Sequence, residues 1–588
     1  MPRTFDIKVL QEPDGLADAI ATKFTSWEIA KEDWYKNVKE TLENLYATST
    51  RDIYNQKRDT DNSTHIPKLT QIRDMLVTYY LDAMFSLPDS VEWEPYSTEN
   101  VSTNTKNALK ALIKQMQKDS GFEDIARTLV EDFVDYGNTF ATAVNVTEKL
   151  GEKIIYQGPK AVRLNPSDIF FDPLVADFKK TPKIIRSIMT IGELMKSVEE
   201  FPDDENTYKK AVKEAVKKRG EIKNSLSVGN SDELKDDVVR IAGCGSWREY
   251  YNSDTVEILT FYGDIFDMSD NTLHKGKRIV IMDRCKVLLE EDIPDYGFLD
   301  NIFKGGWRDR KDILWSMSPL DNIKGMQFMI DFLENKRADI FNFISNPVVV
   351  TRGDVEMPEY LYPGSQIGLD VDGDFQFAKP DATALQADTY IQMYLTMMEE
   401  MAGTPREAMG FRTPGEKTAF EVSQLNTASS RLFNEKVRKF EKEILEPLLT
   451  LMIRMYLAVP GRLVKVHLKD EANREITREL SVDELMSSGR FVAVGSSTYT
   501  EKARIAQTLL QLSNSALYAD QLVSNYFDPK IIAEAITYAT GLDKFNDLLR
   551  PNARIDAEIE MRQAAEVGTQ MIEEQQVRGI MDAEQATM

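Results

Sequence analysis

Residues 323–347 read IKGMQFMIDFLENKRADIFNFISNP, and this stretch decides how the middle of the chain folds. Its apolar residues recur at alternating steps of three and four from Ile323 to Ile344, as on one stripe of an α-helix. Pro347 cannot continue a helix, so we expect one helix of about 25 residues, ~37 Å long at ~1.5 Å per residue. A helix of this length is able to line a channel wall, although an ordinary core helix would show the same stripe.

A segment of different character, residues 347–381, follows this helix. Val348–Val350 and Gln366–Leu369 favour strands, and glycines and prolines supply turns between them. We therefore expect a small β-containing lobe. Its carboxylates outnumber its two basic residues, Arg352 and Lys379, which gives an acidic face better suited to a protein partner than to phosphate. The candidate docking residues of this face are Asp354, Glu356, Glu359, Asp370, Asp372 and Asp374.

The helical pattern resumes at Ala384 and stops at Gly403-Thr404-Pro405. A helix, a lobe and a second helix are joined most economically when the helices run antiparallel and hold the lobe at their far end. Residues 404–418, TPREAMGFRTPGEKT, form a loop too charged to bury, and a helical stripe of about 55 Å then runs from Phe420 to Tyr456. Pro447, inside this stripe, is expected to kink the helix.

The first half of the chain predicts an α+β domain. Helical patterns cover Leu16–Tyr46, Ile66–Phe85 and Asn107–Tyr136. Two short strands, Ile154–Tyr156 and Ala161–Leu164, are expected on either side of a Gly-Pro turn. The highly charged residues 197–237 predict a solvated helix that runs into a mobile loop, with a basic DNA-binding arm as the alternative.

The composition limits the possible functions. The 588 residues include 96 acidic and 72 basic side chains, a net charge of −24, so the field of the protein repels nucleic acid. Cys244, Cys285 and three scattered histidines make neither a disulfide framework nor a metal cluster, and the histidines are expected to be ordinary surface or strand residues. No export signal and no membrane-spanning helix is visible. We expect a protein without cofactor or metal, made inside a cell.

Two segments approach known ligand-binding motifs without matching them. Residues 410–418, GFRTPGEKT, resemble a phosphate-binding loop, but Glu416 separates the glycine from Lys417 and a Met-rich helix, not a strand, precedes them. Residues 370–381 begin like a calcium loop, but Phe375 stands where the turn requires glycine. Nucleotide binding and a calcium-binding hand are therefore set aside, and looser cation binding by the acidic lobe stays open.

In the order of these features the chain resembles the portal proteins of tailed bacteriophages, specifically the larger portals of the short-tailed type. The resemblance covers most of the chain. It is carried by Asp135-Tyr136-Gly137-Asn138 before a strand, Gly158-Pro159, Asn165-Pro166-Ser167-Asp168, Phe171-Asp172-Pro173, Gly306-Trp307-Arg308 and Ser318-Pro319-Leu320-Asp321, and by the helix, lobe, helix, loop and long helix that follow.

The resemblance implies a mainly helical α+β portal fold, assembled as a ring, normally of twelve copies, at one vertex of the capsid. Double-stranded DNA would be packaged and ejected through its hole. By position, the wing corresponds to 1–318, the stem helices to 319–346 and 382–403, the clip to 347–381, the tunnel loop to 404–418, the long wing helix and C-terminal wing strands to 419–498, and the crown to 499–588.

The same resemblance implies the partners. The clip would dock the terminase large subunit during packaging and a head-tail adaptor afterwards, and the ring would contact the major capsid protein and the scaffold protein. The expected location is the virion, after synthesis in the host cytoplasm, with no membrane partner.

A few cations are candidates to meet the DNA. Each neutralised phosphate adds affinity and therefore friction, so a sliding duplex is best met by few positive charges. Arg406, Arg412 and Lys417 of the tunnel loop are these candidates, and salt bridges to nearby glutamates or to a neighbouring subunit are the alternative. Arg337, in the apolar stripe of the first stem helix, would face the channel or pair between subunits.

The prediction is therefore a structural, non-enzymatic protein. One alternative is an enzyme of the packaging machinery, either an ATPase or a nuclease, which needs a phosphate loop or metal-binding carboxylates that the sequence does not display. The other is a connector or scaffold protein without a pore wide enough for DNA.

Overall fold

The fold was analysed in a computed structural model, in which the chain divides into two units. The first unit comprises Met1–Ala83 and Gly121–Met452, and the second comprises Met84–Ser120 and Ile453–Met588. The structure describes residues 5–7, 13–46, 62–85, 91–95, 103–345 with gaps at 152, 176, 200–207, 223–229, most of 242–254 and 268–270, 348–378 with gaps at 354, 357, 359–365 and 370–371, and 387–402, 433–458, 464–469, 475–480 and 489–493. Helices and strands are both abundant in these residues, which confirms the α+β class.

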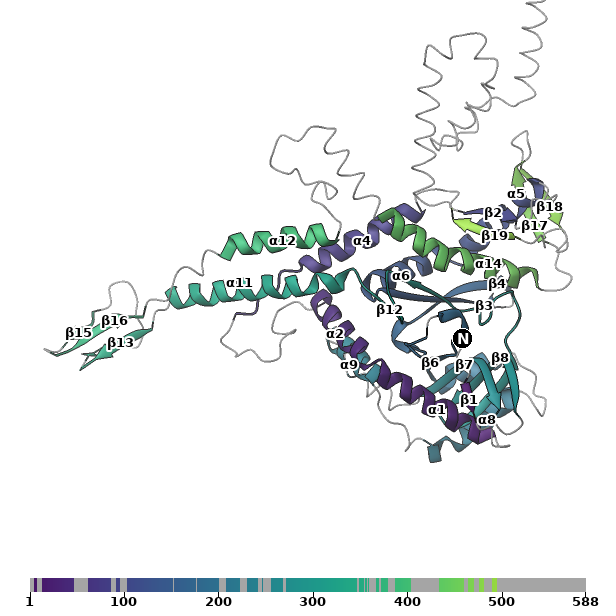
Figure 1. Ribbon diagram of the computed structural model, residues 1–588, viewed down its shortest axis with the longest axis horizontal. Coiled ribbons are helices and arrows are strands. Elements are labelled where there is room, and N and C mark those ends of the chain that lie inside the picture. The colour runs from purple at the N-terminus through teal and green to yellow at the C-terminus, as the bar shows by residue number, and fades with distance from the viewer. Residues whose placement is uncertain are drawn as a thin grey trace, which may run out of the picture. The chain divides into compact units, whose positions relative to one another are not determined.

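A six-stranded sheet forms the core of the first unit (Figure 1). Its strands lie in the order β5 (Ile169–Phe170), β6 (Lys183–Thr190), β7 (Thr255–Asp267), β8 (Thr272–Met282) and β9 (Lys286–Asp292), all antiparallel, and β1 (Phe5–Ile7) pairs parallel with the end of β7. Alternate residues of β7 point to opposite faces, and both faces are buried.

Helices cover both faces of this sheet. The helices α1 (Pro13–Ala30), α2 (Glu32–Tyr46) and α9 (Asn230–Ile241) pack on the face that includes Leu259 and Phe261. The helices α7 (Ile191–Ser197) and α8 (Tyr208–Ile222) pack on the face that includes Val256 and Ile258. Each side therefore has its own apolar core.

A second sheet, of three antiparallel strands, lies in the same unit. Its order is β10 (Phe303–Gly306), β3 (Asn138–Leu150) and β4 (Lys153–Leu164). Helix α6 (Phe122–Asp135) contacts β3 and β4, and the hairpin of β11 (Arg308–Arg310) and β12 (Ile313–Met317) continues from β10. Aromatic rings join α6 to α4 (Lys68–Phe85) and to the long helix at 433–457, through Tyr80, Phe133 and Phe440.

The middle of the chain has the predicted helix, lobe and helix (Figure 1). A 3₁₀ turn, η4 (Leu320–Asn322), leads into α11 (Lys324–Ser345), which lies alongside α12 (Asp388–Ala402). Between them in sequence are two small antiparallel pairs, β13 (Val349–Arg352) with β16 (Asp374–Phe377) and β14 (Val355–Glu356) with β15 (Gly368–Leu369). Residues 379–386, in which the second helical pattern was expected to begin, lie outside the described residues.

The second unit has its own β-structure. Strand β2 (Val91–Pro95) pairs antiparallel with β19 (Gly489–Ala493), and β17 (Val464–Lys469) pairs with β18 (Glu475–Leu480). Helix α5 (Thr103–Asp119) packs against β2 and β17. The strands expected between residues 460 and 498 are therefore present, whereas residues 499–588, the expected crown, lie outside the described residues.

Three predictions from the sequence were wrong in detail. The pattern over Asn107–Tyr136 belongs to two helices, α5 and α6, separated at Ser120-Gly121, where Gly121 has a φ of 65°. Gly158-Pro159 does not end a strand, because both residues lie inside β4. The end of the charged segment 197–237 was expected to be a mobile loop, but residues 230–237 lie in helix α9.

The long helix continues through Pro447. Residues 433–457 are helical without interruption, and Glu441–Leu445 form a π-helical turn just before the proline. There the N–H of Glu446 donates to the carbonyl of Glu441, five residues earlier. Pro447 has no N–H to donate to a carbonyl four residues earlier. A π-helical turn, with bonds between residues five apart, changes the local hydrogen bonding of the helix at this point. Residues 419–432 lie outside the described residues.

Candidate functional site: an acidic lobe on a fixed helix

The start of α11 is where several of the sequence motifs meet. Gly137 has a φ of 66°, and its Cα lies so close to the backbone of Met317 and Ser318 that a Cβ would approach the Met317 carbonyl oxygen to 2.6 Å. The Gly137 carbonyl accepts a hydrogen bond from the Trp307 N–H at 2.9 Å. The Asn138 side chain bonds both backbone groups of Ser316, at 2.9 and 3.0 Å. Residues far apart in the sequence thus form one junction.

Ser318 and Asp321 fix the turn from which α11 begins. The Ser318 hydroxyl donates to the carbonyl of Val134 at 2.7 Å and accepts from the N–H of Leu320 at 3.0 Å. The Asp321 carboxylate accepts from the Ser318 N–H at 2.9 Å and from the Asn37 side chain at 2.7 Å. The direction in which α11 leaves the core is therefore set by hydrogen bonds to α6 and α2.

Two buried carboxylates near the end of α6, next to this junction, form ion pairs. Asp132 accepts two hydrogen bonds from Arg163, at 2.6 and 2.7 Å, and Asp135 accepts two from Arg73, at 2.8 and 2.7 Å. Burial raises the pKa of Asp132 to about 7, against the opposing effect of Arg163, and it also raises the pKa of Asp135. These paired arginine forks connect α6 with β4 and α4.

A polar stripe on α11 lies beside the apolar stripe that the sequence displays. Its members follow each other at steps of four, which places them on one face of a helix: Gln327, Asp331, Asn335 and Asp339. This stripe binds segment 62–69, which leads into α4, because Asn335 exchanges two hydrogen bonds with Thr64, at 2.7 and 2.8 Å, and Gln327 accepts from the N–H of Leu69 at 3.0 Å.

Asp331 is the centre of this contact. Its carboxylate lies 2.7 Å from Nδ1 of His65 and accepts hydrogen bonds from the Ile66 N–H and from the Gln327 amide, both at 3.0 Å. The side chains of His65 and Asp331 are 2% and 1% exposed. The expectation that the histidines are surface or strand residues is therefore wrong for His65, which is a buried partner of a carboxylate.

Helix α12 is attached to the same assembly. Lys68, at the start of α4, forms an ion pair of 2.7 Å with Glu399 of α12, and both side chains are largely buried. Arg337 forms ion pairs with Asp388 of α12 and, at 2.6 Å, with Glu334. The structure thus gives Arg337 partners within its own chain, which neither of the two sequence interpretations had anticipated.

The lobe at the end of α11 exposes acidic and apolar side chains together. Glu356, Asp372 and Asp374 are exposed, and so are apolar residues such as Val350 and Leu369, which are 57% and 51% accessible. Each pair of strands in the lobe is at most four residues long, so the lobe has little core of its own. Exposed apolar residues rimmed by charges are typical of protein-binding surfaces. Asp354, Glu359 and Asp370 lie outside the described residues.

The candidate DNA-contacting cations of the tunnel loop, Arg406, Arg412 and Lys417, also lie outside the described residues. Among the residues that the structure describes, no three histidine, cysteine or acidic side chains are placed to hold a metal ion. Within the same part of the chain, no helix combines the length and the apolar character needed to cross a bilayer.

Comparison with known proteins gives no family for this chain: no protein-family model matches it, and no curated protein shows significant similarity to it.

Proposed function

We propose that this chain is the subunit of a portal ring, a structural protein that serves as a DNA conduit and as a docking platform at one capsid vertex. The observation that carries the proposal is the acidic and apolar lobe, held between α11 and α12 at the end of a helix whose base is fixed by hydrogen bonds. A docking surface must be held at a fixed distance from the core if it is to transmit force, and a helix pair provides this.

The order of elements along the chain supports the same proposal. A mixed α+β region, a helix, a β-lobe, a second helix and a long helix follow one another as they do in the portal family. The net charge of −24 also agrees with a conduit, because an acidic ring does not retain the duplex that slides through it.

Imaging of the purified protein in negative stain tests the ring. We expect closed rings with an open centre of about 20 Å or more, since a duplex whose major groove alone is ~12 Å across must pass. Rings with a closed centre, or no rings at all, would favour a connector without a pore. ATP turnover by the isolated chain would favour the enzyme of the packaging machinery.

A triple variant tests the docking role of the lobe. Replacing Glu356, Asp372 and Asp374 by alanine should leave ring formation intact and weaken binding of the terminase large subunit and of the head-tail adaptor, measured by pull-down. A matched control removes three exposed carboxylates elsewhere, at Asp18, Glu123 and Asp124. Equal binding by the two variants would contradict docking through the acidic face.

A further inference from the structure

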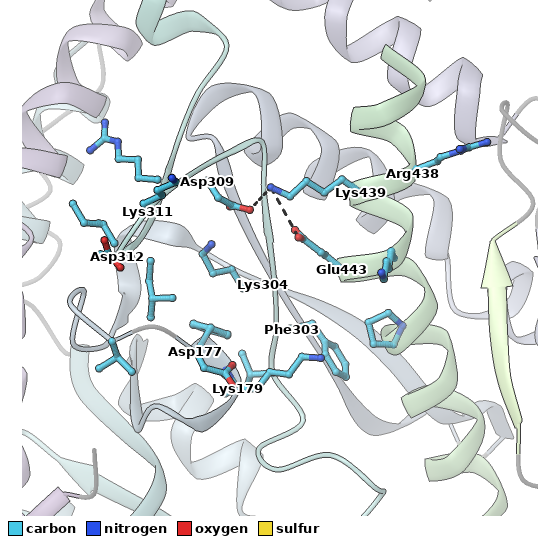
Figure 2. Close-up of a pocket in the computed structure, with 18 of the residues that line it drawn as sticks. Asp177, Lys179, Phe303, Lys304, Asp309, Lys311, Asp312, Arg438, Lys439 and Glu443 are labelled. Carbon is cyan, nitrogen blue, oxygen red and sulfur yellow. Dashed lines mark hydrogen bonds and ion pairs between the residues drawn. The ribbon is translucent and has the colours of Figure 1, made fainter. Parts of the chain in front are cut away.

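A cleft of about 920 Å³ lies in the first unit, away from the lobe (Figure 2). Its walls are the β10 strand, the β11–β12 hairpin, the turn at Phe178–Lys180 and the long helix at 433–457. The cleft is large enough for several side chains of another molecule.

The cleft carries more positive than negative side chains, in contrast to the whole protein. Its lining includes seven basic residues, Lys179, Lys304, Arg310, Lys311, Arg438, Lys439 and Lys442, and five acidic ones, Asp177, Asp309, Asp312, Glu435 and Glu443. Two excess positive charges therefore gather here in a chain whose net charge is −24.

The central carboxylates of the cleft are already engaged within the chain. Asp309 pairs with Lys439 and accepts a hydrogen bond from the Ser316 hydroxyl at 2.8 Å. Glu443 accepts from the N–H of Gly306 at 3.0 Å and lies 3.9 Å from the Lys439 amine. Figure 2 marks the contacts of Lys439 with Asp309 and Glu443. Lys439 is therefore held by two carboxylates of its own chain.

Lys304 is a basic group of the cleft that forms no ion pair within 4 Å among the described residues. Its amine is largely buried and, among the described residues, donates one hydrogen bond, to the neutral Ser316 hydroxyl at 3.2 Å. Burial lowers the pKa of Lys304, because it removes the charged amine from water, and the nearby Asp309 and Glu443 carboxylates oppose this shift. At the rim, Lys311 and Lys442 have no carboxylate within 4 Å in the described part of the chain. A ligand with several carboxylates would supply partners to these amines.

The lining also has an apolar part, which narrows the class of ligand. Phe303, Ile313, Leu314 and Pro447 lie among the charged residues. A nucleic-acid backbone offers phosphates but few apolar groups to these side chains. An acidic polypeptide that also carries apolar side chains complements both parts of the cleft.

We propose that this cleft receives an acidic, partly apolar segment from a neighbouring copy of the chain. The inference rests on the proposed ring. Copies related by rotation in a ring meet through two different surfaces, so one face must be complementary to another. The cleft is a concave, positively charged surface on a protein that is otherwise acidic, and a second copy supplies negative charge in excess.

Charge reversal at the rim tests the inference. We expect the double variant Lys311→Glu/Lys442→Glu to need at least about tenfold more protein for half-maximal ring formation in sedimentation velocity. The control Lys210→Glu/Lys217→Glu makes the same change of charge on two exposed residues of α8 and should change this concentration less than about twofold. Circular dichroism checks that both variants fold.

A second variant separates docking from folding. Lys304→Met removes the buried amine and keeps the apolar stem, so it should weaken ring formation without lowering the free energy of unfolding. If the wild type forms no rings, the proposed function fails. If rings form and the cleft variants assemble like the control, only this inference is overturned. Binding of a short DNA duplex that depends on Lys304, with unchanged assembly, would also overturn it and assign the cleft to nucleic acid.

Discussion

Gly137 is the position where a single methyl group should disturb the junction most. Its φ of 66° is unfavourable for any residue with a Cβ, and the added atom would lie 2.6 Å from the Met317 carbonyl oxygen and closer still to Met317 C and Ser318 N. These are backbone atoms just before the turn that begins α11, so they cannot rotate away. The substitution Gly137→Ala therefore has to move the start of α11 or the end of α6.

The expected cost follows from three contributions. The left-handed conformation costs about 1 kcal/mol for alanine, and the lower entropy of the unfolded chain offsets roughly half of this. Overpacking against a fixed backbone adds about 2 kcal/mol. Weakening of the bonds from Trp307 to Gly137 and from Ser318 to Val134 adds about 1 kcal/mol. Together these lower the free energy of unfolding by about 3 to 4 kcal/mol.

Gly121 provides a matched control for this prediction. Its φ of 65° is nearly the same, but a Cβ there would meet no atom within 4 Å. Gly121→Ala should therefore cost only about 0 to 1 kcal/mol. Urea unfolding followed by tryptophan fluorescence measures both variants, since Trp307 and Trp315 are buried near the junction. Equal stability of the two variants would refute the reasoning that the close backbone approach makes Gly137 necessary.

Three further predictions concern charged side chains. Asp331→Ala should lower the free energy of unfolding by about 3 kcal/mol, because it leaves the buried donors of segment 62–69 unpaired. Asp339→Ala, near the outer end of the stripe, should lower it by only about 1 kcal/mol. Urea unfolding of the two variants compares these losses. Arg337→Ala should cost less than about 1 kcal/mol and less still at high salt, since its partner on α12 is exposed; a larger loss in chemical denaturation would contradict a surface pair. Burial raises the pKa of Glu441 from 4.5 to about 8, so the folded state holds a proton that the unfolded state releases, and wild-type stability should fall as the pH rises from 4.5 to 8. Glu441→Gln should remove this contribution to the pH dependence of stability, which is at most about 1.4 kcal/mol per pH unit. An equal change in melting temperature between pH 5 and pH 8 for the wild type and the variant would contradict this role of Glu441.

Patterns that depend on neighbours in the chain were predictable. The helix expected from Ile323 to Pro347 appears as α11, Lys324–Ser345, because its apolar period and the proline that ends it are both local. Strand β4 was harder, since Gly158-Pro159 normally marks a turn. In the structure β4 is an edge strand, where the missing N–H of Pro159 is not needed by another strand.

Helix α9 was missed because its own sequence is mostly polar. Its place is decided by Asp232, which is buried and forms an ion pair of 2.8 Å with Arg186 on β6, and by Leu234 in the core against β7. Neither partner is near in the sequence, so the pattern of residues 230–241 alone favours a loop.

The sequence by itself determined the helix, lobe and helix in the middle of this protein, the excess of acidic residues in the lobe, and the net charge. The tertiary structure alone decided that Asp135-Tyr136-Gly137-Asn138, Gly306-Trp307-Arg308 and Ser318-Pro319-Leu320-Asp321 form one junction, and that His65 binds Asp331. The physical reason is the separation along the sequence of the residues that interact. Helical periods and turns arise from residues a few positions apart, whereas a backbone contact or a buried hydrogen bond joins residues more than a hundred positions apart and leaves no periodic trace in either segment.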